Sequence, residues 1–271
     1  MAKIDASKLQ DGDVMLYHGT SLLSKIIMTF DGGSYSHAGI FRAGHITEAL
    51  GDGINQSAIA TSVAGAKYVD VYRFTKDADP LGSAQYPAAP LDAAIVTFET
   101  NKNAYAYDEL LLLALLCSTR QLTTIMRTPG LAMVVRNFLD SAMEVLAKMM
   151  AVGRKPVICS EMVFRCFENA DAAGKYALEI RGADVPMAAE LDGIVANATP
   201  ADSASAQQIR AQAAAFLRNY SQAVHAQAPP AVTALLGEYS AAAAGLAVAN
   251  FVTPHDLQDS PNLQLAGTLS A

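Results

Sequence analysis

The sequence predicts an α+β fold, in which a small sheet packs against several helices. Short apolar segments with strand-like patterns gather in the first third of the chain, around residues 12–16, 37–50 and 68–74. Helical spacing of apolar residues and alanine-rich segments fill most of the remainder. With 271 residues, of which 52% are hydrophobic and 17% charged, the chain is long enough for one large domain or two small ones.

The first helix is predicted at Leu22 to Phe30, where apolar residues recur at helical spacing. Thr20 and Ser21 precede it, and both are residue types that cap helix N-termini. The glycine-containing segment 31–34 ends the helix and supplies a flexible turn just before His37.

A β-hairpin is predicted next, with one strand at 37–41 and its return strand at 45–50. Gly44 supplies the positive φ that the tight turn at 42–44 needs. A turn centred on Arg42 and Ala43 places Glu48 opposite His37, with Cβ atoms about 5 Å apart. From that position a carboxylate can accept a hydrogen bond from one imidazole nitrogen and orient the ring.

Later elements follow from the same patterns. Residues 68–74 alternate as a strand, whereas the proline- and glycine-rich stretch 77–90 is expected to be a loop. Residues 91–99 fit a helix or a buried strand. Further helices are expected at 131–152, 201–225 and 231–250.

His37 and Cys159 are the two candidate catalytic residues. Cys159 lies where the short apolar run 156–158 meets the predicted start of a helix. The positive end of a helix dipole favours the thiolate, which is the nucleophilic form of cysteine. A nearby imidazole can take the thiol proton and return it to a leaving group. Together with Glu48, these residues form the predicted catalytic set.

Several segments carry a resemblance to a known family. They are Gly12-Asp13-Val14-Met15-Leu16, Ser34-Tyr35-Ser36-His37-Ala38-Gly39-Ile40, Cys159-Ser160-Glu161-Met162-Val163, Thr253-Pro254-His255-Asp256-Leu257 with Ser260-Pro261, and, more weakly, Tyr105-Ala106-Tyr107-Asp108. In this order they resemble the permuted papain-fold amidases of the NlpC superfamily, especially the YiiX-like group. Histidine before cysteine is the order of the permuted form.

The resemblance implies a circularly permuted papain-like fold: a small antiparallel sheet with packed helices and large helical insertions. It implies one catalytic domain over 1–271, with a helical insertion at 105–152, an alanine-rich helical insertion at 183–250 and a closing core segment at 251–271. It favours a helix at 91–99 and a polar residue, here Glu48, on the strand after the histidine strand. The implied activity is hydrolysis of a peptide, cell-wall-type or N-acyl amide through an acyl-thioester on Cys159, with His37 as general base and acid.

Two alternatives stay open. In 131–152, Arg136, Asp140, Glu144 and Lys148 are spaced four apart, which leaves a broad apolar surface beside one polar stripe. This surface favours a lipid acyl hydrolase or acyltransferase, of the lecithin:retinol acyltransferase type, that uses the same Cys-His-Glu site on a phospholipid ester. The other alternative is a non-enzymatic helical binding protein on a degenerate papain-like scaffold.

No metal or cofactor is expected. His18 and His45 show no metal-ligand spacing with any cysteine, and His225 and His255 stand alone. No glycine-rich phosphate-binding fingerprint occurs either. Cys117 and Cys166 are expected in the core, and the three cysteines show no paired spacing typical of a disulfide framework.

The formal net charge of −7 argues against a nucleic-acid partner. The expected partner is a small-molecule, peptide or acyl-lipid substrate, and the oligomeric state is left open. Residues 1–8 are charged where a secretory signal would be apolar, so a cytoplasmic location is expected, with export by a signal-less route left open. The apolar run at 110–116 is too short to cross a bilayer, but peripheral membrane contact through 110–152 or 231–252 is left open.

Overall fold

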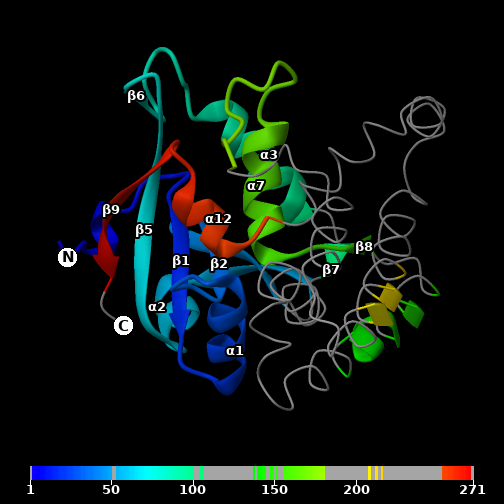
Figure 1. Cartoon of the computed structure of the whole chain (residues 1–271). Helices are drawn as coiled ribbons and strands as arrows, with labels where there is room; N and C mark the ends of the chain where they lie inside the picture. Colours follow the sequence, from blue (N-terminus) through cyan, green and yellow to red (C-terminus); the bar gives the residue numbers. More distant parts are fainter. Residues whose placement is uncertain are drawn as a thin grey trace.

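The structure is a computed structural model that describes residues 2–50, 53–100, 104–105, 137, 139–144, 147–148, 151, 155–180, 207–208, 211–212, 215 and 252–269. In this part of the chain a curled antiparallel sheet packs against helices (Figure 1). The predicted α+β class is confirmed at this level.

The sheet is built in the order β4-β3-β2-β1-β5-β6, and β9 also pairs with β5. Each of these pairings is antiparallel. A separate parallel pair joins β7 to β8. The strands are β1 (Val14–Gly19), β2 (His37–Arg42), β3 (His45–Leu50), β4 (Gly53–Ala58), β5 (Ala66–Lys76), β6 (Asp79–Pro80), β7 (Ala104–Tyr105), β8 (Lys155–Pro156) and β9 (Leu263–Leu269).

The helices agree with the local sequence signals. Ser21 caps α1 by accepting a hydrogen bond from the Ser24 N–H, and Gly32 ends the helix at φ 68°. Residues 91–99 fold as a helix, whereas the expected loop 77–90 also holds β6 and the start of that helix. The helices are η1 (Ala6–Lys8), α1 (Leu22–Asp31), α2 (Ile59–Val63), α3 (Ala89–Thr100), α7 (Cys159–Asn169) and α12 (Pro254–Asp259).

The β2–β3 hairpin forms as predicted, but its register differs from the expected one. The two turn residues are Ala43 and Gly44, both with positive φ (48° and 85°), which is the pattern of a type I′ turn. Because the turn is centred one residue later than expected, Glu48 pairs with Gly39 and not with His37. This shifts the pairing by two residues, so Glu48 stays on the same face of the sheet as His37.

The sheet buries residues on both faces, because successive side chains of a strand point to opposite sides. Arg42 and Thr47 form hydrogen bonds with Glu99 of α3, which places α3 on their face of the sheet. Helix α7 packs against α3 and β2, and Figure 1 shows the two helices side by side next to the sheet. The opposite face carries the core cluster of Met15, Tyr17, Phe41, Ile46, Val63, Val69, Val71 and Leu269.

Residues 252–269 pack with this core. Strand β5 lies between β1 and β9 and pairs with both (Figure 1). The Ser160 hydroxyl, at the start of α7, donates to the carbonyl of Val252 at 2.6 Å. Thr253 and Asp256 then cap α12 reciprocally, since each side chain accepts a hydrogen bond from the other's backbone N–H. The hydrogen bond between Ser160 and Val252 therefore ties the N-terminal end of α7 to the segment that begins at residue 252.

The opening segment Gly12-Asp13 has a structural role. A Cβ on Gly12 would lie 2.3 Å from Leu81 Cδ2, and the φ of Gly12 is 90°, so glycine is required there. Buried Asp13 accepts a hydrogen bond from Arg73 Nε at 2.9 Å, which ties the start of β1 to β5.

The two expected insertions fall largely outside the described residues. Of 105–152, the described residues at 137, 139–144, 147–148 and 151 are helical, and Glu144 pairs with Lys148 four residues on (2.7 Å). Of 183–250, residues 207–208, 211–212 and 215 are described, and they are also helical. Among the residues that the structure describes, no helix is both long and apolar enough to cross a membrane.

Candidate active site

His37 begins strand β2, directly opposite Tyr17 of β1. The two rings are in contact, with centroids 5.0 Å apart and an interplanar angle of 57°. The backbone N–H of Ser36 donates to the carbonyl of Tyr17, so the loop that delivers His37 is fixed to the same strand. The imidazole side chain is 15% exposed, which keeps it at the edge of the buried region.

Glu48 meets His37 diagonally across the hairpin. Its Oε2 lies 3.0 Å from His37 Nε2, and its side chain is only 4% exposed. The residue directly opposite Glu48 is Gly39, which has no side chain to fill the space between them. A Cβ on Gly39 would lie 2.8 Å from Ile46 Cγ2 and 3.5 Å from Glu48 Cβ. The glycine thus leaves room for Glu48 to lean towards the histidine.

The polar groups around Glu48 keep it ionised. Burial alone raises the pKa of the Glu48 carboxyl, but the hydrogen bond with His37 and its positive charge lower it, and Ser57 and Ser62 lower it further. The net result is a pKa below the ordinary glutamate value. A carboxylate only accepts hydrogen bonds, so His37 Nε2 must carry the proton in this contact. In the neutral imidazole, Nδ1 is therefore the basic nitrogen.

Cys159 is the first residue of α7, as the sequence predicts. The preceding residue Ile158 is extended, and its carbonyl accepts the first helical hydrogen bond from Met162 N–H at 2.8 Å. Cys159 is fully buried. Its sulfur therefore lies at the positive end of an 11-residue helix dipole and in a low-dielectric interior, where electrostatic effects are strong.

His37, Glu48 and Cys159 all influence the pKa of the Tyr17 hydroxyl. Burial raises the pKa of Tyr17, the Glu48 charge raises it further, His37 lowers it and the charge of Cys159 raises it. Coulombic effects weaken with distance, so each of the three groups lies in the neighbourhood of this phenol.

Sequence reasoning missed three polar residues of this neighbourhood. Ser62 Oγ donates to Glu48 Oε2 at 3.2 Å, and Tyr17 OH lies 2.6 Å from Ser62 Oγ. The hydroxyl of Ser57 also forms a hydrogen bond with Glu48. Nothing in the local sequence marks the two serines, because they reach Glu48 only through the folding of β4 and α2. Tyr17 offered one signal, since its strand neighbours at 14–16 are all apolar.

The other histidines and cysteines have structural surroundings. Buried Cys166 has a thiol pKa raised by burial and by the Glu99 charge, so it stays a protonated core thiol. His18 stacks on Tyr68, and His45 hydrogen-bonds Glu99. Cys117 and His225 lie outside the described residues. Over the described residues, no group of three histidine, cysteine or acidic side chains could hold a metal ion.

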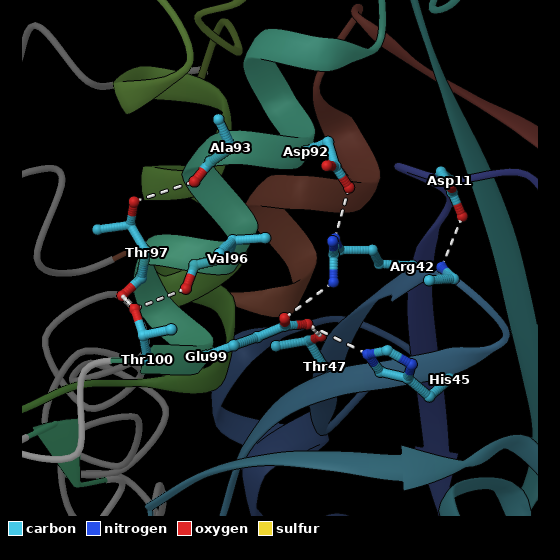
Figure 2. Close-up of polar contacts among 11 residues, drawn as sticks. Asp11, Arg42, His45, Thr47, Asp92, Ala93, Val96, Thr97, Glu99 and Thr100 are labelled. Carbon is cyan, nitrogen blue, oxygen red and sulfur yellow. Dashed lines mark hydrogen bonds and ion pairs between the residues drawn. The ribbon is translucent and has the colours of Figure 1, made fainter.

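A separate polar network joins α3 to the hairpin (Figure 2). The Glu99 side chain is only 5% exposed and accepts hydrogen bonds from Thr47 (2.6 Å) and Arg42 (3.0 Å), and it lies 3.2 Å from His45 Nε2. Arg42 also donates to Asp92 at 2.5 Å. This network holds β2 and β3 from the face opposite Glu48, so it fixes the two strands that carry His37 and Glu48.

Comparison with known proteins adds no relative: neither protein-family models nor curated proteins match this chain.

Proposed function

We propose that this protein is a cysteine hydrolase that cleaves an amide bond through an acyl-thioester on Cys159, on a circularly permuted papain-like fold. The observation that carries the proposal is the His37–Glu48 pair, with Nε2 and Oε2 3.0 Å apart, on the two strands against which α7 packs. A histidine oriented by a buried carboxylate, near a cysteine at a helix N-terminus, is the arrangement that nucleophilic catalysis requires.

In the first half of the reaction, His37 Nδ1 accepts the thiol proton and Cys159 Sγ attacks the carbonyl carbon of the amide. The carbonyl π electrons move to oxygen, and a tetrahedral oxyanion forms. The backbone N–H of Cys159, at the start of α7, is a donor for that oxygen. The C–N bond then breaks as His37 returns the proton to the leaving amine, and an acyl-thioester remains.

In the second half, His37 Nδ1 takes a proton from a water molecule whose oxygen attacks the thioester carbon. Collapse of this second tetrahedral intermediate breaks the C–S bond and returns the proton to sulfur, which releases a carboxylic acid. Glu48 stays ionised throughout because its pKa is low, and it stabilises the imidazolium in both halves.

The test uses intact-protein mass spectrometry after incubation with peptide, cell-wall-type and N-acyl amides and with a phospholipid. An amide hydrolase gains an acyl mass on Cys159, and Cys159→Ala abolishes both the adduct and turnover. Cys166→Ala is the matched control, because that thiol lies in the core with a raised pKa and should be dispensable. Faster acyl release from the phospholipid than from any amide would assign the lipid-ester alternative.

Iodoacetamide at mildly acidic pH tests the nucleophile without a substrate. An activated Cys159 reacts faster in the native protein than cysteine does in the unfolded protein. If native Cys159 reacts no faster than Cys117 and Cys166 do after unfolding, the protein is not a thiol enzyme, and the binding-protein alternative gains.

A further inference from the structure

Glu48 is held by more than its contact with His37. Its Oε2 accepts a hydrogen bond from Ser62 Oγ at 3.2 Å, and Ser62 lies on the short helix α2 that follows β4. A serine hydroxyl has a single proton to donate. Since Ser62 gives that proton to the carboxylate, its oxygen can only accept from any other partner.

The other partner of Ser62 is Tyr17, whose hydroxyl lies 2.6 Å from Ser62 Oγ. Tyr17 must be the donor in this contact, because the proton of Ser62 is already engaged with Glu48. Burial raises the pKa of Tyr17, so the phenol keeps its proton at any pH at which the enzyme would work. Tyr17 is 4% exposed, so water competes little for this hydrogen bond.

These contacts form a closed circuit of four residues. The Tyr17 ring contacts the His37 ring, the Tyr17 hydroxyl donates to Ser62, Ser62 donates to Glu48, and Glu48 accepts from His37. Each donor in the sequence strengthens the next by polarising it. A carboxylate that receives a second donor on the oxygen that faces His37 is fixed in orientation as well as in charge.

We propose that Ser62 and Tyr17 form a hydrogen-bond relay that positions Glu48 against His37, and that both are positioning residues of the proposed thiol hydrolase. The proposal rests on the proposed function for its catalytic meaning, but the relay itself has a direct physical readout. Ser62 acts on Glu48 directly, and the Tyr17 hydroxyl acts on Glu48 through Ser62.

The experiment follows the titration of the Glu48 carboxyl carbon by ¹³C NMR, with Glu48→Gln to assign the signal. Ser62→Ala removes a donor to the carboxylate, so the Glu48 pKa should rise. Ser62→Thr keeps the hydroxyl and should restore the wild-type titration. Thr61→Ala, which removes the exposed hydroxyl next to Ser62 on the same helix, is the matched control and should change nothing.

Tyr17→Phe tests whether the Tyr17 hydroxyl acts through Ser62. Alone it should raise the Glu48 pKa by less than Ser62→Ala does, and in the Ser62→Ala background it should add nothing, because the path through Ser62 is already broken. Additive effects of the two substitutions would overturn the relay, and so would a Glu48 titration that is unchanged in Ser62→Ala.

The rate of Cys159 alkylation separates the relay from the proposed function. If both hold, Ser62→Ala lowers that rate by roughly three- to tenfold, the scale of one ordinary net hydrogen bond. Slow alkylation in the wild type together with a shifted Glu48 titration in Ser62→Ala would refute the proposed thiol hydrolase and support the relay. Rapid wild-type alkylation with an unshifted titration would do the reverse.

Discussion

Gly39 offers the most direct test of how the hairpin builds the site. In Gly39→Ala the new Cβ would lie 2.8 Å from Ile46 Cγ2 and 3.3 Å from the Thr47 carbonyl oxygen. Ile46 is completely buried in the core cluster, so it cannot move away without disturbing its neighbours. Overpacking of this kind costs about 1–3 kcal/mol. The reduced entropy of the unfolded chain returns about 0.4–1 kcal/mol.

The expected net loss is therefore at most about 2.6 kcal/mol and centred near about 1.3 kcal/mol, or roughly 3–5 °C in the melting temperature. Thermal unfolding followed by circular dichroism measures it. Gly65→Ala is the control, because a Cβ there meets nothing within 4 Å. A second expected effect is a weaker His37–Glu48 contact, since β3 must move away from β2 to admit the methyl group. If Gly39→Ala unfolds at the same temperature as Gly65→Ala, the argument from close approach is wrong.

Three further outcomes are expected. The partners of Glu48 hold its pKa in the folded protein below its pKa in the unfolded chain. The stability that they confer is complete above the unfolded pKa and is lost as the pH falls through the folded pKa. Glu48→Gln should therefore weaken the loss of stability at acid pH, measured by urea unfolding at several pH values. Glu99→Ala should cost about 3 kcal/mol in urea unfolding, because Arg42 loses a buried partner, whereas exposed Glu144→Ala should cost little. Ser160→Ala should cost about 1–3 kcal/mol by the same measurement, since the buried Val252 carbonyl loses its donor.

The hairpin and helix boundaries near the candidate site could be predicted because their signals are local. Ser21 and Gly32 bound α1, and Gly44 gives the turn its positive φ. The pairing register could not be fixed in this way, since a turn at 42–43 and a turn at 43–44 have nearly the same local signals. The face of Glu48 was nevertheless right, because the two registers differ by an even number of residues.

The polar residues around Glu48 could not be predicted from the sequence for a different reason. Ser57, Ser62 and Tyr17 come from three elements, and ordinary serines and tyrosines carry no motif. The network around Glu99 was missed for the same reason, since Arg42 and Glu99 are distant in sequence and meet only when α3 lies on the sheet. The catalytic role of Cys159, His37 and Glu48 remains a prediction for the experiments above.

The position of β9 has a consequence for biosynthesis. Residues 69–74 of β5 pair with β9, and the backbone of Thr268 also exchanges hydrogen bonds with residues 2 and 4. A ribosome releases β5 long before β9 exists, so a nascent chain carries an exposed strand edge that can pair with other chains. Slower translation or a lower growth temperature should therefore change the yield of native protein more than it changes the amount synthesised.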